Sequence, residues 1–220
     1  TEPLPDNGHC LSVDLGLHNL MTCYDSTGRS FIMGREYLSI CRKYDKEIAR
    51  VQSQWAKTQA KKGVRYPKPS GHVLSLYRKK RDRIKDYLHK VTRGLTDYCI
   101  KEDINTVIIG DIRNIRKGSD LGKKNNQKLH GLPYEKIYCM LEYKLKQACI
   151  VLVKQEESYT SQCSPYAPAV SSEYAKRSNR KKRGLYAAEG KVFNADAVGA
   201  YNIMRKYFSA SGRTVELSVS

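Results

Sequence analysis

The chain has 220 residues, 40% of them hydrophobic, so it is long enough to bury a core, and wholesale disorder is excluded. Forty Lys and Arg against 22 Asp and Glu give a formal charge of +18, which is typical of proteins that bind a polyanion such as nucleic acid. No stretch approaches the roughly twenty continuous apolar residues of a membrane span. The polar, Pro-rich start does not resemble a signal peptide, so we expect a cytoplasmic protein with no membrane partner.

Three short strands are expected at the start of the chain. Apolar runs at 8–17, 19–28 and 29–34 are separated by turn-forming residues, and tight turns between strands predict an antiparallel meander. The hydrophobic period changes from about residue 36, where a helix is predicted. A basic loop rich in Gly and Pro is expected over 56–72.

A long helix follows this loop. Its predicted apolar face consists of Val73, Leu76, Tyr77, Ile84, Leu88, Val91, Leu95 and Cys99. Arg78, Lys79, Lys80, Arg81 and Arg83 charge the other face. This basic run is either a solvated helix face or a nucleic-acid contact, and the sequence leaves both interpretations open.

The second half of the chain alternates strands and helices. The apolar, β-branched run at 104–112 predicts a strand buried on both faces. After a basic loop, Pro133 opens a helix, and a further buried strand is expected over 149–158. A long polar stretch then leads to a last helix, for which Asn194 is a plausible N-cap. We predict an α/β fold with a mixed five-stranded sheet, flanking helices and a long helical insertion.

Carboxylates recur at the ends of the predicted strands and at the start of the last helix. They are Asp14, Asp111, Glu156, Glu157 and Asp196. Taken singly, each is more often a turn or cap residue. In open α/β sheets, however, strand ends meet at one edge, so these acids can converge although they are far apart in the sequence. A cluster of hard oxygen ligands is what two-metal hydrolysis of a phosphodiester requires.

Four segments in this order resemble the RuvC-like nuclease domain of the TnpB family, the transposon-encoded RNA-guided DNA endonucleases related to type V CRISPR effectors. The segments are "VDLGLHNL", "VIIGDI", "EESYTSQCS" and "FNADAVGAYNI", and the resemblance extends from about Leu11 to Lys206. It implies an RNase H-like (RuvC-like) fold, an acid triad that binds Mg²⁺ or Mn²⁺, and guide RNA and target DNA as partners. It also implies an origin in a prokaryote, a phage or another mobile element.

The resemblance assigns the first and last acids directly. Asp14 matches the acid of the family's DxG motif, and Asp196 matches the acid of its last motif. The middle acid departs from the common pattern, because Gly110 stands where most relatives have Glu. "EESYTS" is similar to a family variant in which this glutamate has moved to the next strand, so Glu157 is the expected third acid. Glu156 and Asp111 are the alternatives.

No structural zinc is expected. The seven cysteines are scattered and form no CxxC pair, whereas many relatives have two such pairs between the last two acids. Only Cys163 stands in that region, so we expect a basic loop or degenerate zinc ribbon over about 159–192. Val198 replaces the Asn that is usual in the last motif, which could loosen hydrogen bonding around Asp196.

The expected layout is a single nuclease domain with one large insertion. We assign 1–9 to a linker from a missing N-terminal region, 10–208 to the nuclease domain with its helical insertion at about 36–104, and 209–220 to a tail. The predicted phosphate-binding residues are Lys123, Lys124, Arg180, Lys181, Lys182 and Arg183. Tyr159 and Tyr186 are candidates for base stacking, although packing in the core or on the surface is the more common fate of a given Tyr.

Three functional interpretations remain open. The first is a Mg²⁺-dependent endodeoxyribonuclease domain. The second is a catalytically inactive nucleic-acid-binding derivative of the same family, for which the substitution at Gly110 is the main support. The third, a basic RNA-binding structural protein, explains the charge but not four ordered motifs.

Overall fold

The computed structural model describes residues 2–111, 133–180 and 184–212. The chain divides into two compact units, which are described separately. One comprises Thr1–Met33 and Thr92–Ser220, and the other comprises Gly34–Val91. Lys123, Lys124, Lys181, Lys182 and Arg183, which we predicted to bind phosphate, lie outside the described residues.

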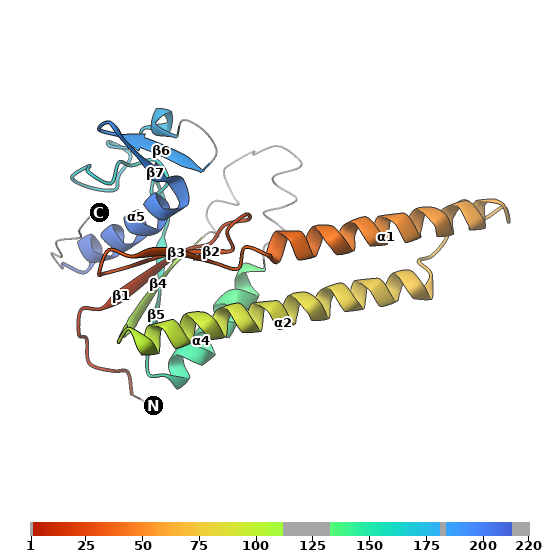
Figure 1. The fold of residues 1–220 in the computed structure, drawn as a ribbon, viewed down its shortest axis with the longest axis horizontal. Helices are drawn as coiled ribbons and strands as arrows, with labels where there is room; N and C mark the ends of the chain where they lie inside the picture. The colour runs from red at the N-terminus through yellow and green to blue at the C-terminus, as the bar shows by residue number, and fades with distance from the viewer. Residues whose placement is uncertain (1, 112–132, 181–183, 213–220) are drawn as a thin grey trace. The chain divides into compact units, whose positions relative to one another are not determined.

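The first unit is built on a mixed five-stranded sheet (Figure 1). Its strands are β1 (Cys10–Asp14), β2 (Met21–Asp25), β3 (Ser30–Met33), β4 (Thr106–Asp111) and β5 (Val151–Glu156). Their order across the sheet is β3-β2-β1-β4-β5. The first three strands form the predicted antiparallel meander, and β4 lies parallel to both β1 and β5. The predicted α/β class is therefore confirmed.

Burial follows the position of each strand in the sheet. Strands β1 and β4 are central, and nearly all of their residues are buried. The prediction of a fully buried strand at 149–158 is wrong, because β5 is only half-buried. Among the described strands, β5 lies at the edge of the sheet and pairs only with β4, and its first residue, Val151, is 36% exposed.

Helix α5 (Ala195–Ala210) covers one face of this sheet. Cys10 and Ile108 pack against Ala200, Ile203, Met204 and Phe208 of this helix. The Ser12 hydroxyl donates a hydrogen bond of 2.7 Å to the Ala200 carbonyl, which links the helix to the centre of β1. Helix α4 (Tyr134–Gln147) lies on the opposite side of the sheet from α5 (Figure 1).

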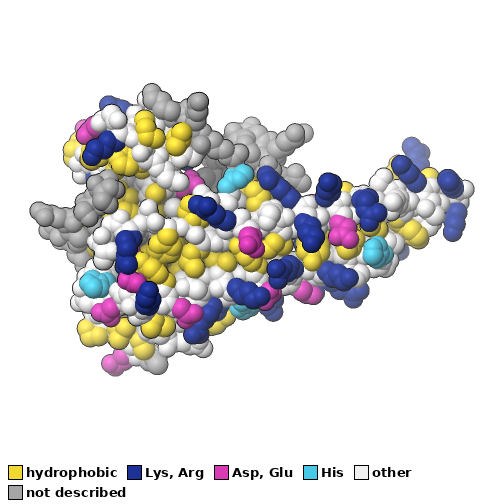
Figure 2. Space-filling view, in the orientation of Figure 1, with side chains coloured by type: hydrophobic (Ala, Val, Ile, Leu, Met, Phe, Trp, Pro, Cys, Tyr) yellow, Lys and Arg dark blue, Asp and Glu magenta, His cyan; other side chains and the backbone are white. Residues whose placement is uncertain are grey.

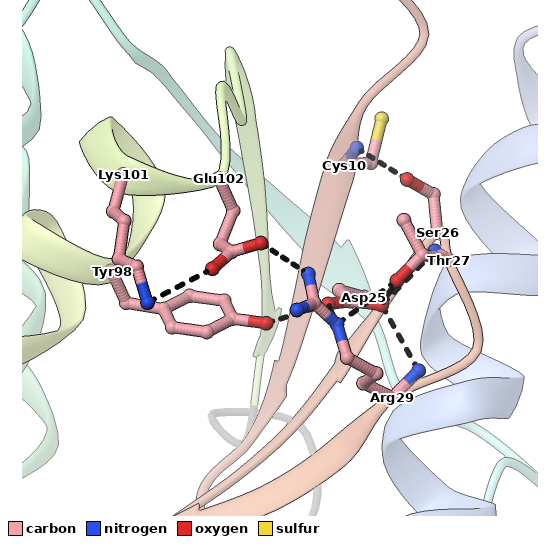
Figure 3. Close-up of polar contacts among 8 residues, drawn as sticks. All are labelled: Cys10, Asp25, Ser26, Thr27, Arg29, Tyr98, Lys101 and Glu102. Atoms are coloured by element: carbon pink, nitrogen blue, oxygen red, sulfur yellow. Dashed lines mark hydrogen bonds and ion pairs between the residues drawn. The ribbon is translucent and has the colours of Figure 1, made fainter.

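A buried carboxylate joins the β2–β3 turn to the end of α2 (Gly71–Lys101), as Figure 3 shows. The Asp25 carboxylate accepts hydrogen bonds from Thr27, from the backbone and side chain of Arg29, and from the Tyr98 hydroxyl at 2.6 Å. Arg29 also pairs with Glu102 at 2.6 Å. Burial opposes ionisation of Asp25, but these donors outweigh it and lower its pKa.

The second unit contains α1 (Tyr37–Ala60) and the first part of α2. Ile48 of α1 packs with Val73 and Leu76 of α2, and Lys80 pairs with Asp45 at 2.5 Å. Helix α1 continues into the segment that we predicted to be a loop. Tyr77 does not belong to the apolar face as predicted, because it is 45% exposed. It directly follows Leu76, and one residue turns the side chain about 100° around the helix.

The polar stretch before α5 contains a hairpin that the sequence did not reveal. Strands β6 (Leu185–Ala188) and β7 (Lys191–Asn194) pair antiparallel. Asn194 then caps α5 as predicted, since its side chain accepts hydrogen bonds from the backbone N–H groups of Asp196 and Ala197 at 2.9 and 3.2 Å. Across the described ranges, none of the helices combines the length and apolar character that crossing a membrane requires.

Candidate active site

Asp14 ends β1 and faces α5. Side chains alternate along a strand, so Asp14 shares the sheet face of Cys10 and Ser12, which contact that helix. A Cβ at Gly199 of α5 would lie 2.4 Å from Oδ2 of Asp14. Glycine at this position therefore provides the space in which the Asp14 carboxylate lies beneath the helix.

Glu157 fills the space left by Gly110. Strands β4 and β5 run in parallel register with Gly110 opposite Gln155, so Glu157 lies just beyond the end of β5. A Cβ at Gly110 would lie 1.6 Å from Oε1 of Glu157, which means that the glutamate side chain occupies the volume of the missing one. Glu157 is only 8% exposed, and its Oε1 has no hydrogen-bond partner among the described residues.

The charges of these acids act on one another. Burial, followed by the charges of Asp14, Asp111 and Glu156, raises the pKa of Glu157 to about 9. Burial and the charge of Asp196 raise the pKa of Asp14 to about 7, and Arg180 opposes this shift. The charge of Asp14 therefore interacts with those of both Glu157 and Asp196. Ionisation of Glu157 is therefore disfavoured in the absence of a cation.

Asp196 lies in the first turn of α5 and is held from two sides. The Asn19 side-chain amide donates a hydrogen bond of 2.8 Å to Oδ2 of Asp196, and the Arg180 guanidinium is 4.0 Å from Oδ1. Asn19 belongs to the β1–β2 turn. A Cβ at Gly16 would lie 2.8 Å from the Asn19 carbonyl oxygen, so this turn requires glycine there. From the sequence, Asn19 gave only the signal of a turn residue.

Glu156 and Asp111, the alternatives to Glu157 as the third acid, have different surroundings from Glu157. The Glu156 carboxylate accepts a hydrogen bond of 2.6 Å from the Ser158 backbone N–H and also bonds to the Ser158 hydroxyl and the Lys206 ammonium. Burial opposes ionisation of Glu156, but these bonds outweigh it and lower its pKa. Asp111 follows Gly110 on β4 and is opposite Glu156, so its side chain starts on the other sheet face. Neither residue has the orphaned, buried oxygen of Glu157.

The two tyrosines that we considered for base stacking differ. Tyr159 is 41% exposed, so its ring is accessible. Tyr186 is fully buried, so of the two alternatives for this residue packing in the core holds and base stacking does not. Its hydroxyl donates to the Gln162 carbonyl at 3.0 Å and accepts from the Asn179 amide at 3.1 Å, which makes it a core residue of the stretch before α5.

The neighbouring acids do not form a finished metal site. Within residues 2–111, 133–180 and 184–212, no three His, Cys, Asp or Glu side chains have the arrangement of a metal-binding group. The donor set nevertheless fits Mg²⁺ or Mn²⁺, which prefer carboxylate oxygens. The unpartnered Oε1 of Glu157, buried beside a second carboxylate, is the observation that supports this fit.

Comparison with models of known protein families identifies the family of this chain. The OrfB_IS605 family model, described as a probable transposase, matches residues 1–116, more than half of the chain. The chain belongs to the TnpB family. A second model, the Cas12f1-like TNB domain, matches residues 134–203 of this TnpB-family chain. No curated protein matches the chain.

Solved structures with the same fold include several Cas12 proteins. A Cas12f1–sgRNA–target DNA complex has a TM-score of 0.66 and 19% identity, over 91% of this chain and 50% of that one. A CRISPR-Cas12f ternary complex has a TM-score of 0.64 and 18% identity, over 100% and 41%. The mini-RNA-guided endonuclease CRISPR-Cas_phi3 has a TM-score of 0.51 and 13% identity, over 96% and 46%. This TnpB-family chain spans half or less of the length of these three proteins.

Proposed function

We propose that this chain is the metal-dependent DNA endonuclease domain of an RNA-guided TnpB-family enzyme, with Asp14, Glu157 and Asp196 as the acids that hold Mg²⁺ or Mn²⁺. The observation that carries the proposal is the fit between Gly110 and Glu157. The common acid of the family is absent at position 110, and a buried glutamate from the next strand occupies its volume beside Asp14. No structural role explains an orphaned carboxyl oxygen at this depth.

The residues around the acids have distinct roles in this proposal. When bound, the divalent cations would lower the pKa of a water molecule and stabilise the charge that develops on the phosphodiester. Asn19 keeps the Asp196 carboxylate oriented, and Gly199 keeps α5 close to Asp14. Arg180, near Asp196 and 43% exposed at its side chain, is available to bind the phosphate of a DNA strand.

The partners follow from the family and from the neighbours. We infer guide RNA and target DNA as ligands of the whole protein, since a Cas12f1 structure with this fold is a complex with sgRNA and target DNA. The formal charge of +18 is consistent with such polyanions. Mobile elements of prokaryotes are the source that the family suggests, and the cytoplasm is the compartment that we propose.

Moving the third acid from position 157, after β5, to position 110 on β4 tests this proposal. Gly110→Glu adds a side chain where Glu157 already lies, and Glu157→Gly removes the acid, so each single variant should lose on the order of 100-fold in Mg²⁺- or Mn²⁺-dependent cleavage. The double variant returns to the common family pattern and should recover part of the activity. Cleavage is measured on DNA with the longest natural form of the protein and its guide RNA.

Two further variants complete this test. Asp14→Ala should abolish cleavage, whereas Glu156→Gln, which changes the neighbouring carboxylate bonded to Lys206, should preserve it. If Asp14→Ala and Glu157→Gly both cleave at the unaltered rate, the site is wrong.

The inactive, nucleic-acid-binding derivative is the alternative. Gly110 in place of the usual acid favours it, together with the lack of a ready-made metal-binding group in the described part of the chain. It predicts guide-dependent DNA binding without cleavage at any concentration of Mg²⁺ or Mn²⁺. Binding that is equal in the unaltered protein and in Asp14→Ala, with no product in either, would establish it.

A further inference from the structure

The positive charge of this chain is concentrated in its helical unit. Residues 34–91 contain 17 Lys and Arg against five Asp and Glu, a formal charge of +12 out of the total of +18. From residue 48 to residue 81 there are ten Lys and Arg and no acid at all. Figure 2 shows Lys and Arg side chains along the visible face of helices α1 and α2 and around the turn that joins them.

The turn between α1 and α2 is a basic part of the helical unit that is open to solvent. Its basic side chains are Lys57, Lys61, Lys62, Arg65 and Lys68, and all five residues are exposed. Within the described residues, no ion pair joins any of the five to a carboxylate. Farther along α2, by contrast, Lys80, Arg81 and Arg83 each pair with an aspartate. The charge of the turn is therefore available to a ligand.

An exposed aromatic ring, that of Tyr66, lies between the basic residues of this turn in the sequence. Tyr66 is 83% exposed, the highest value among the large hydrophobic residues that the structure describes. The Arg65 guanidinium lies 5.5 Å from the centre of its ring, which is a cation–π geometry. No packing explains so large an exposed ring, and an aromatic ring flanked by cations is the arrangement that stacks a nucleobase while binding its phosphates.

Hydrogen bonds and prolines restrain the backbone of the turn. The Trp55 indole N–H donates a hydrogen bond of 2.9 Å to the Lys68 carbonyl, which fixes the end of the turn against α1. The Val64 N–H bonds to the Gln59 carbonyl at 3.1 Å, and Gly63 adopts a φ of 78°. Pro67 and Pro69 restrict the backbone further. These restraints lower the conformational entropy that the backbone of the turn would lose on binding.

We propose that the α1–α2 turn, residues 57–68, is a binding site for an unpaired nucleic-acid strand, in which a base stacks on Tyr66 and the five basic side chains bind the adjacent phosphates. This site is formed within the helical unit and contains none of the nuclease acids. Its function is to bind a single-stranded segment of RNA or DNA, and it does not depend on metal.

Fluorescence anisotropy of the complete chain tests the stacking, with labelled 12-nucleotide poly-U RNA, poly-dT DNA and a DNA duplex as probes. Tyr66→Ala should weaken binding of a single-stranded probe by about 5- to 100-fold and leave the duplex unaffected, since stacking is worth about 1–3 kcal/mol per base. Tyr66→Trp should restore the affinity. The RNA and DNA probes distinguish which kind of strand the turn binds.

A matched pair of charge reversals tests the phosphate contacts. Lys61→Glu with Lys62→Glu should lower both the affinity and the dependence of the binding constant on salt. Lys43→Glu with Lys46→Glu, an equal change of charge on exposed residues of α1, is the control. If Tyr66→Ala changes no single-strand affinity by as much as twofold, or if the two reversals have equal effects, the proposal is wrong.

Discussion

At the scale of single residues, the buried acids Asp25 and Glu157 differ in the hydrogen-bond donors around their carboxyl groups. Asp25 is 1% exposed, and its carboxylate has donors from Thr27, Arg29 and Tyr98. Glu157 is 8% exposed, and its Oε1 has none in the described part of the chain. Donors stabilise the charge of Asp25 and lower its pKa, whereas burial, followed by the charges of Asp14, Asp111 and Glu156, raises the pKa of Glu157 to about 9.

The raised pKa of Glu157 predicts that this acid, although required for cleavage in our proposal, destabilises the folded protein at neutral and higher pH. An acid whose pKa is higher in the folded state destabilises the fold as pH rises from about 4.3, its unfolded value, towards 9. Glu157→Gln keeps the shape and removes the ionisation. Without metal at pH 8, this variant should melt a few degrees higher, of the order expected for about 1 kcal/mol.

Thermal melts of both proteins at pH 5 and pH 8, without metal, check this expectation. The difference between the two proteins should shrink at pH 5, because this pH is only slightly above the unfolded pKa of about 4.3 and little of the destabilisation has yet developed. The variant should not cleave DNA. A variant that melts lower at pH 8 would contradict the assignment of an uncompensated buried acid.

Asn19 is expected to act on metal binding through Asp196. Asn19→Ala removes the 2.8 Å hydrogen bond that orients the Asp196 carboxylate, and loss of such a partner typically costs 10- to 100-fold in metal affinity. Calorimetric titration with Mn²⁺ measures this affinity directly. Saturating metal should restore most of the cleavage rate in Asn19→Ala but none in Asp196→Ala. An unchanged Mn²⁺ affinity would show that Asn19 belongs only to the turn.

At the scale of elements, packing around small residues brings the acids together. Helix α5 approaches β1 closely because Gly199 has no side chain, and β4 leaves space at its end because of Gly110. The β1–β2 turn closes on Gly16 and presents Asn19 to the start of α5. Three strand ends, one turn and one helix start thus converge, although their residues are far apart in the sequence.

The network around Asp25 should stabilise the junction of the β2–β3 turn with α2. Asp25→Asn removes a charged acceptor of several hydrogen bonds and should lower the free energy of unfolding by about 2 kcal/mol at neutral pH. The folded pKa of Asp25 is lowered, so its stabilisation is present above the unfolded value of about 3.9 and is lost as pH falls through the folded value.

Urea denaturation at pH 7 and at pH 3 measures this contribution, with Asp45→Asn as a control on an exposed pair. The loss in Asp25→Asn should be smaller at pH 3 than at pH 7. An equal loss at both values would mean that the charge of Asp25 contributes nothing.

At the scale of the whole molecule, the positive charge and the acids of the candidate active site lie in different units. The helical unit has two thirds of the net charge, and the sheet unit contains Asp14, Glu157 and Asp196. We expect nucleic-acid affinity of the whole chain to fall by about tenfold or more between 50 and 200 mM salt, because bound phosphates release counterions. Anisotropy titrations over this range measure the slope. A slope near zero would exclude phosphate contacts as the main source of affinity.

Much of this architecture was predictable because its signals are local. Alternation and apolar runs gave the meander, β4 and the parallel crossovers, and Asn194 was identified as a cap from its position before an apolar helical period. The β6–β7 hairpin was missed, since its strands are short and polar. The burial of β5 was overestimated because hydrophobicity does not reveal which strand lies at an edge.

The sequence by itself determined the fold class, the family and the order of the acids along the chain, because all three depend on residue types and spacing. The sequence favoured Glu157 over Glu156 only by resemblance, and the tertiary structure showed how the surroundings of the two residues differ. Both follow the same strand, and beyond a strand end the direction of a side chain depends on the path of the chain and on its neighbours. Gly110 and Lys206 made the difference here, one by leaving space for Glu157 and the other by binding Glu156.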